Sequence, residues 1–128
     1  MARILVVDDS GDLLRSMKTL LSKEGYEVEV CKLAAEAIIR VRDNPPYDLI
    51  IVDYVMPGMD GRTFIKTLRE TYPGRTSPFL VITGSDDAKN PPLPEVKHLL
   101  AKPFSDRELF ETISDILEKG QTHGERKG

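Results

Sequence analysis

Short apolar segments and segments with helical spacing alternate along the whole chain. Three of the apolar segments are rich in β-branched residues and contain no polar position, which is typical of strands buried on both faces. They are Ile4–Val7, Leu49–Val52 and Phe79–Ile82. Residues 27–30 alternate charged and apolar side chains, which predicts a half-exposed edge strand. A short fifth strand is expected at His98–Ala101.

Apolar side chains recur every three to four residues in four other segments, so each is predicted to be a helix with one apolar stripe. The stripes are Leu13, Leu14, Met17, Leu20 and Leu21; Ala34, Ala37, Ile38 and Val41; Phe64, Ile65, Leu68 and Tyr72; and Leu109, Phe110, Ile113, Ile116 and Leu117. Gly25 is expected to follow the first helix in a left-handed conformation, and Ser105 with Glu108 predicts a capping box before the last. The last helix is expected to close at Gly120, ahead of a polar tail over residues 120–128.

Strands that alternate with connecting helices predict an α/β fold with one parallel sheet covered on both faces. In open sheets of this kind, ligands bind beyond the carboxyl ends of the strands. Four of the five predicted strands end in polar residues, which are Asp8 and Asp9, Asp53, Thr83, and Lys102 followed by Pro103. Each of these residues alone is most simply a solvated strand end, but their convergence at one edge predicts a site.

The residue types at this edge indicate phosphoryl chemistry. Three carboxylates repel one another unless a cation neutralises them, and Mg²⁺, which keeps open water positions, suits such ligands. A lysine opposite supplies a charge for a phosphoryl oxygen, and a threonine hydroxyl can form a hydrogen bond with another. Because positioning and charge neutralisation are the main means of catalysis in phosphoryl transfer, this set of residues predicts that class of reaction.

Composition narrows the function classes. The 128 residues suit one domain, and 18 lysines and arginines against 21 aspartates and glutamates give a net charge of −3, so no basic surface for nucleic acid is expected. The apolar runs are too short to cross a membrane. The single cysteine, Cys31, allows no internal disulfide and is expected to be a small buried hydrophobic residue. We therefore expect a protein of the reducing cytoplasm.

Four motifs surround the predicted strand ends. They are Ile-Leu-Val-Val-Asp8-Asp9, Leu-Ile-Ile-Val-Asp53-Tyr-Val-Met-Pro57-Gly58-Met-Asp60-Gly61, Val-Ile-Thr83-Gly84 and Ala-Lys102-Pro103-Phe104. Together, over residues 2–119, they resemble the receiver domain of bacterial two-component response regulators, of the chemotaxis-regulator type. The resemblance implies a flavodoxin-like, doubly wound sheet of five parallel strands in the order 2-1-3-4-5. It also implies a cis Lys102–Pro103 bond and a turn at Asp60–Gly61 that opens the third helix.

The same resemblance implies a role for each polar residue. Asp53 would be the phosphoacceptor of a sensor histidine kinase or a phosphotransfer protein. Asp8, Asp9, Asp53 and the backbone carbonyl of Val55 would hold Mg²⁺, while Thr83 and Lys102 would bind the phosphoryl group. The expected protein is a phosphorelay signalling module and not an enzyme, since it catalyses only its own phosphorylation and dephosphorylation. It is expected to act on a downstream protein target, as a monomer or a phosphorylation-dependent dimer, without direct contact with nucleic acid or membrane.

Two features depart from the family pattern. Leu99 stands three residues before the lysine, where such receivers often have Tyr or Phe, so aromatic coupling to the signalling face is not expected. The crossover before the fifth strand contains three prolines, Pro91, Pro92 and Pro94. Because proline beyond the first turn disrupts a helix, the fourth helix is expected to be short or missing, unless Asn90 caps a brief helix with the prolines in its first turn.

Two other classes of protein share parts of the pattern. A Mg²⁺-dependent phosphatase of the haloacid dehalogenase type also uses an aspartate nucleophile after an apolar strand. It needs a second carboxylate two residues later, where this chain has Val55. A flavodoxin-like module that binds flavin needs a first loop of hydroxyls and glycines, whereas residues 8–12 here contain three aspartates. A receiver kept only for interaction is disfavoured, because all five polar residues are present.

Overall fold

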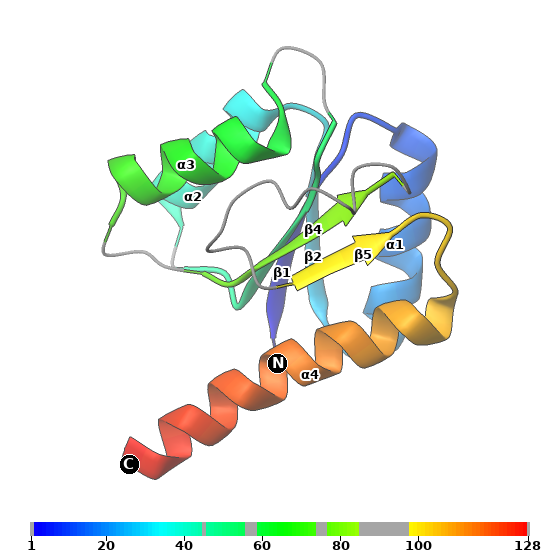
Figure 1. Ribbon diagram of the computed structural model, residues 1–128, viewed down its shortest axis with the longest axis vertical. Helices are drawn as coiled ribbons and strands as arrows, with labels where there is room; N and C mark the ends of the chain where they lie inside the picture. Colours follow the sequence, from blue (N-terminus) through cyan, green and yellow to red (C-terminus); the bar gives the residue numbers. More distant parts are fainter. Residues whose placement is uncertain (1, 45, 56–58, 74–76, 85–97, 128) are drawn as a thin grey trace.

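Five parallel strands form one sheet in the order β2-β1-β3-β4-β5 (Figure 1). The computed structural model describes residues 2–44, 46–55, 59–73, 77–84 and 98–127, with side chains up to residue 118. The strands are β1 (Arg3–Val7), β2 (Glu27–Cys31), β3 (Leu49–Asp53), β4 (Phe79–Thr83) and β5 (His98–Ala101). The helices are α1 (Gly11–Lys23), α2 (Ala34–Asp43), α3 (Gly61–Thr71) and α4 (Asp106–Lys127). The predicted fold class and strand order are confirmed.

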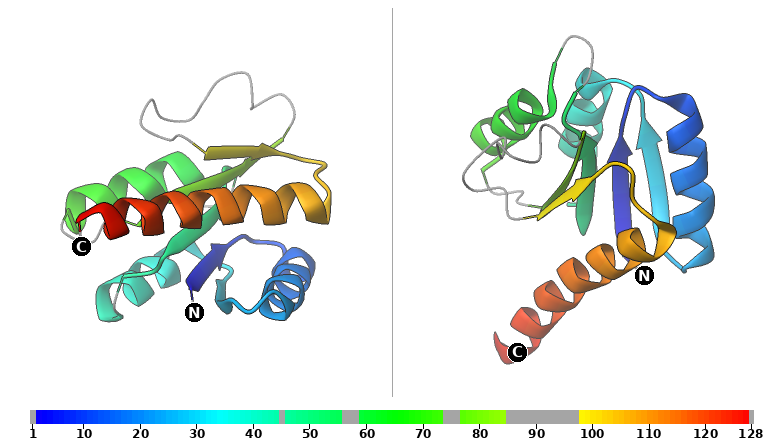
Figure 2. Two further views of the ribbon diagram at one scale, coloured as in Figure 1. Left: turned by 90° about the horizontal axis from the view of Figure 1, so that it is seen from below. Right: turned by 45° about the vertical axis from the view of Figure 1, so that its right-hand side comes forward.

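Helices cover both faces of the sheet (Figures 1 and 2). On one face, the buried residues of α1 and α4 are Leu14, Met17, Leu21, Leu109, Ile113 and Ile116. On the other face, the buried apolar side chains of α2 and α3 are Ala34, Ala37, Val41, Phe64, Ile65 and Leu68. Neighbouring residues of one strand belong to opposite cores, as Leu5 and Val6 do, because side chains alternate along a strand. The strands without polar positions are thus the ones covered on both faces.

The register of the strands brings four loops to one edge. β1 pairs Val7 with Cys31 of β2 on one side and with Val52 of β3 on the other. β4 pairs Thr83 with Ala101 of β5. Since all strands are parallel, the loops after β1, β3, β4 and β5 leave the sheet at the same edge, and the switch in strand order lies between β1 and β3.

Two predicted helix ends agree with the structure. Gly25 has a φ of 92°, and its N–H and that of the next residue donate to carbonyls in the last turn of α1 in the pattern of a Schellman motif. Ahead of α4, Ser105 Oγ accepts a hydrogen bond from the N–H of Glu108 at 3.1 Å, and the Glu108 carboxylate accepts one from the N–H of Ser105 at 3.1 Å. This reciprocal pair is the predicted capping box.

One predicted helix end is wrong. The sequence predicts that the last helix closes at Gly120, whereas α4 continues to Lys127. Glycine costs only about 1 kcal/mol relative to alanine inside a helix, and no proline follows to interrupt the hydrogen bonds. The residues after Gly120 include glutamate, arginine and lysine, which are good helix formers. The polar segment expected as a tail therefore extends the helix.

The crossover between β4 and β5 falls on residues 85–97, which lie outside the described residues together with the predicted short or missing fourth helix. Leu99, on β5, is partly buried against the core under α2 and α3. Cys31 is buried, and burial raises the pKa of its thiol to about 11, so the prediction of a small buried residue is confirmed. Across the described ranges, no helix is both long and apolar enough to cross a membrane.

Candidate functional site

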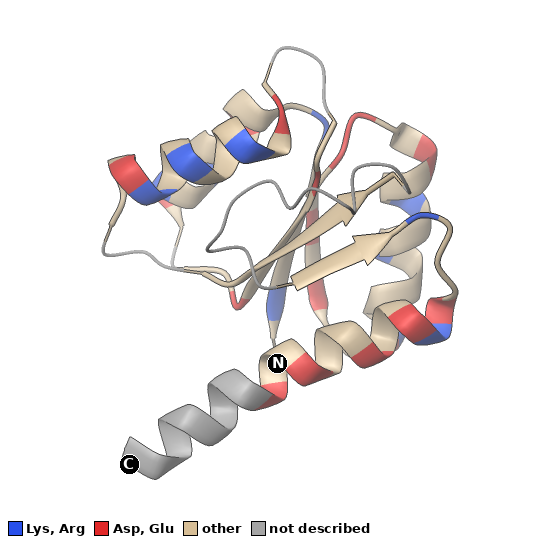
Figure 3. Ribbon diagram, in the orientation of Figure 1, with Lys and Arg blue, Asp and Glu red and all other residues tan. Residues whose placement is uncertain are grey.

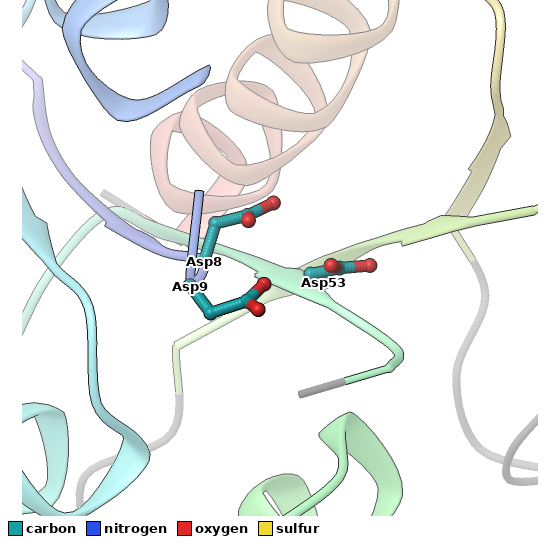
Figure 4. A group of neighbouring side chains, drawn as sticks. All are labelled: Asp8, Asp9 and Asp53. Carbon is teal, nitrogen blue, oxygen red and sulfur yellow. The ribbon is translucent and has the colours of Figure 1, made fainter. Parts of the chain in front are cut away.

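Three aspartates converge at the carboxyl edge of the sheet. Asp8 and Asp9 follow β1, and Asp53 is the last residue of β3. One carboxylate oxygen of each lies within 4.8 Å of those of the other two. Figure 4 shows the carboxylates of Asp8 and Asp9 extending from the end of β1 toward the side on which Asp53 lies. The structure thus brings together the three carboxylates that the sequence predicts as metal ligands.

Asp8 holds its charge in a poorly compensated position. The residue is 2% exposed, and its Oδ1 accepts a hydrogen bond from the N–H of Ser10 at 2.8 Å. Its Oδ2 is buried and makes no hydrogen bond within the described part of the chain. Burial, with a smaller contribution from the charge of Asp53, raises the pKa of Asp8 from 3.8 to about 6. A cation beside this oxygen would therefore stabilise the ionised form.

Lys102 lies opposite Asp53. Its Nζ is 3.8 Å from Oδ2 of Asp53, and its backbone N–H donates to the carbonyl of Thr83 at 2.8 Å. The Lys102–Pro103 bond is cis, as expected. Asp53 is 8% exposed; burial raises the pKa of its carboxyl, and the positive charge of Lys102 opposes that rise. The amide nitrogen of Val55 lies 3.4 Å from the other carboxylate oxygen of Asp53, Oδ1. One oxygen of Asp53 therefore faces the ammonium of Lys102, and the other faces a backbone N–H.

Thr83 ends β4 at the same edge. Its side chain is fully buried, and its Oγ1 has no hydrogen-bond partner among the residues that the structure describes. Leaving a buried hydroxyl unpaired costs roughly 1–3 kcal/mol. A ligand oxygen that reached Thr83 would remove this cost.

The donor set fits a hard divalent cation. Carboxylate oxygens are preferred ligands of Mg²⁺, three are available here, and Oδ2 of Asp8 needs a positive partner. Figure 3 shows an acidic segment after β1 and a basic segment after β5 at this edge. The three aspartates can therefore hold a divalent cation.

Comparison with known proteins identifies the family. The family model for the response regulator receiver domain matches residues 4–114, which include every predicted site residue. The chain belongs to this family. The resemblance that the strand-end motifs indicate is confirmed, and with it the role of the chain as a phosphoacceptor signalling domain.

Curated relatives of this receiver domain are response regulators. It is 33% identical over 126 residues to the transcriptional regulatory protein CpxR homolog of Haemophilus influenzae, covering 93% of this chain and 52% of the relative. It is 34% identical over 124 residues to the response regulator MprA of Mycobacterium sp. strain KMS, covering 91% and 51%. The chain thus spans about half the length of the curated relatives it matches.

Solved receiver structures have the same fold. A response regulator receiver domain protein from Clostridium thermocellum has a TM-score of 0.84 and 25% identity, covering 95% of this chain and 98% of that one. The chemotaxis response regulator CheY4 of Vibrio cholerae has a TM-score of 0.80 and 30% identity, covering 91% and 99%. The fold of this receiver domain is therefore shared over nearly its whole length.

Two contacts of the site are not predicted from the sequence. Ser10 binds Asp8 through its N–H and also caps α1, since its Oγ accepts a hydrogen bond from the N–H of Leu13 at 3.2 Å. A serine three residues before an apolar stripe is the signal that could have located this cap. The second contact is the close approach of Gly61 to β3, for which local pattern has no signal.

Gly61 packs against the backbone at the end of β3. A Cβ atom built on Gly61 would lie 2.8 Å from the carbonyl oxygen of Asp53 and 2.9 Å from Cα of Tyr54. Because both atoms belong to the backbone, Gly61→Ala must displace the end of β3. We expect this variant to lose about 1–3 kcal/mol of unfolding free energy, as overpacked sites do. Urea unfolding followed by circular dichroism measures the loss.

Gly11→Ala is the matched control for this prediction. Gly11 is also the first residue of a helix, but the three atoms nearest to a Cβ there belong to the flexible ends of Lys32 and Arg15, at 3.3 Å or more. We expect no loss of stability, since alanine is the better helix residue. Equal losses in the two variants would contradict the assigned role of Gly61.

Proposed function

We propose that this receiver domain accepts a phosphoryl group on Asp53 from a histidine kinase or a phosphotransfer protein and signals to a downstream protein. The position of Asp53 supports this most strongly. It ends β3 at 3.8 Å from Nζ of Lys102 and within the carboxylate cluster of Asp8 and Asp9. In this role the chain catalyses only its own phosphorylation and dephosphorylation and acts on no other substrate.

The reacting group is a carboxylate oxygen of Asp53. It attacks the phosphorus atom in line with the leaving group of the donor. A bond forms between this oxygen and phosphorus, the bond from phosphorus to the leaving group breaks, and the leaving group keeps the electron pair. The product is an acyl phosphate, so most of the catalysis comes from position and charge rather than from proton transfer.

Lys102 and Thr83 bind the transferred group in this proposal. The ammonium of Lys102 offsets the added negative charge, and the unpartnered hydroxyl of Thr83 donates a hydrogen bond to a phosphoryl oxygen. Mg²⁺ bound by Asp8, Asp9, Asp53 and the backbone carbonyl of Val55 would supply further charge neutralisation to the carboxylate and the phosphoryl oxygens.

The signal is a change in the population of conformations around Thr83. Before the reaction its buried hydroxyl has no partner among the described residues, whereas the acyl phosphate provides one. The conformation with Thr83 turned toward the site is thereby stabilised, and the downstream target binds that conformation.

A cytoplasmic location, a monomer or phosphorylation-dependent dimer, and the lack of direct nucleic-acid contact remain predictions.

The two alternative functions have less support. A phosphatase with an aspartate nucleophile needs a general acid two residues after Asp53, where Val55 exposes 62% of its surface and offers no proton. A flavodoxin-like module needs a first loop that binds phosphate, whereas this loop brings two carboxylates to the site. Neither chemistry fits the residues present.

Intact mass spectrometry tests the proposed function. Purified protein incubated with acetyl phosphate and Mg²⁺ is expected to gain the mass of one phosphoryl group, and to gain far less when EDTA replaces the metal. Hydroxylamine is expected to remove the group, because it cleaves acyl phosphates. No gain in mass would contradict the phosphoacceptor role. A gain that needs no metal would contradict the role of the cluster, and one that resists hydroxylamine would contradict attachment to a carboxylate.

A further inference from the structure

We propose that Lys32, together with Arg15, forms a positively charged approach to the acidic site and favours small phosphodonors with a doubly charged phosphoryl group. The inference rests on the proposed function, because it concerns the donor that Asp53 attacks. It adds the substrate class that this site prefers, and it assigns that preference to two residues outside the predicted site.

Lys32 lies beside the acidic loop in the fold. The N–H of Asp8 donates to the carbonyl of Cys31 at 3.1 Å. The chain therefore leaves β1 toward Asp9 next to the point at which it leaves β2 toward Lys32. Figure 3 shows the basic segment between β2 and α2 and the acidic segment between β1 and α1 at the same edge. Lys32 is exposed, so its charge faces the solvent from which a donor arrives.

Lys32 and Arg15 share the space above Gly11. A Cβ atom built on Gly11 would lie 3.4 Å from Nζ of Lys32 and 3.6 Å from Nη1 of Arg15. The two nitrogens are therefore no farther apart than the sum of these distances. Both cations therefore lie over the first residue of α1, two residues after Asp9.

The charge of Lys32 is not used in an ion pair. Within the described part of the chain, no carboxylate lies at ion-pair distance from its ammonium. Arg15 pairs with Asp12 through Nη2, and its Nη1 faces Gly11. Asp12 offsets the charge of Arg15, so Lys32 contributes the larger share of the positive potential at this point, and that potential attracts an approaching anion.

A phosphodonor that approaches Asp53 is repelled by the carboxylates of the site and attracted by the positive charge of Lys32. It is an anion, so the carboxylates of Asp8, Asp9 and Asp53 repel it, and positive charge beside them raises its local concentration. Both effects grow with the charge of the donor. Lys32 is therefore more important for acetyl phosphate, whose phosphoryl group is doubly charged at neutral pH, than for phosphoramidate, which has less negative charge.

Labelling rates of Lys32→Gln with these two donors test the inference. Initial rates are measured by intact mass at neutral pH, with saturating Mg²⁺ and a series of donor concentrations. We expect KM for acetyl phosphate to rise about threefold to tenfold with an unchanged maximal rate, and KM for phosphoramidate to rise less than about twofold. At high salt the KM of Lys32→Gln for acetyl phosphate is expected to come closer to that of the wild type, since salt screens exposed charges.

Two variants complete the test. Lys32→Arg keeps the charge and is expected to restore the KM of the wild type. Lys23→Gln also removes one positive charge from an exposed lysine. Because Lys23 is the last residue of α1, at the end of the helix away from Gly11 and the site, this variant is expected to change neither KM. An unchanged KM in Lys32→Gln, equal effects on both donors, or an equal effect in Lys23→Gln would overturn the inference while labelling at Asp53 persists. Failure of the wild type to accept a phosphoryl group from either donor would instead overturn the proposed function.

Discussion

Asp53→Asn is expected to gain no phosphoryl group from acetyl phosphate and Mg²⁺ under conditions in which the wild type gains one. The amide keeps the shape of the side chain but removes the anionic oxygen that attacks phosphorus, so no acyl phosphate can form. Lys102 makes its ion pair, at 3.8 Å, with Asp53 and not with Asp8 or Asp9. Intact mass spectrometry of both proteins measures the difference.

Asp60→Asn is the matched control, because Asp60 is the aspartate immediately before α3, in the connection that follows Asp53 and β3. Its carboxylate accepts a hydrogen bond from the N–H of Thr63 at 2.8 Å and so caps α3. Asparagine caps a helix about as well as aspartate, so this variant is expected to be labelled like the wild type. If Asp53→Asn were labelled as well as Asp60→Asn, the phosphoacceptor would be another residue.

Asp8→Asn is expected to stabilise the metal-free protein at pH 8 and to abolish most of its stabilisation by Mg²⁺. Asparagine keeps the oxygen that accepts from Ser10 and removes the charge at the buried oxygen without a partner. The same change removes one ligand of the proposed metal site. The variant is therefore expected to unfold several degrees higher than the wild type in EDTA and to gain little when Mg²⁺ is added.

The pH dependence of this effect has a definite sign. The pKa of Asp8 is about 6 in the folded protein, against 3.8 as its ordinary value. Well below pH 3.8 the carboxyl is protonated in both states. Between pH 3.8 and about 6 the unfolded state loses this proton while the folded state keeps it, so the free energy of unfolding falls as pH rises. The difference between the two pKa values corresponds to about 3 kcal/mol at pH 8. The wild type is thus expected to lose more stability than Asp8→Asn between pH 5 and pH 8 in EDTA.

Asp9→Asn separates the charge effect from the metal effect. Asp9 belongs to the same cluster but is exposed, so its charge is hydrated in the absence of metal. We expect this variant to change the unfolding temperature little in EDTA and to weaken the response to Mg²⁺. If Asp8→Asn were less stable than the wild type at pH 8 in EDTA, its carboxylate would not be the uncompensated charge described here.

Local pattern and connectivity are enough to predict the fold class and the residues that meet at the site. Runs such as Leu49–Val52 have no polar position, so only a strand covered on both faces can bury them, and the alternation with amphipathic helices requires a parallel sheet. The convergence of Asp8, Asp53, Thr83 and Lys102 follows from that sheet, because parallel strands end at one edge. These features depend on local pattern and connectivity, which a sequence contains in full.

How strongly these residues interact depends on distances that are set by the folded chain. The pKa of Asp8 depends on what covers its carboxylate, the packing of Gly61 depends on its distance from the backbone of Asp53, and the charge over Gly11 depends on where Lys32 lies. Burial and Coulomb energies vary with distances through space between residues far apart in the chain. Periodicity sets the face on which a side chain lies but not these distances, so the sequence predicts which groups meet and the fold determines their energies.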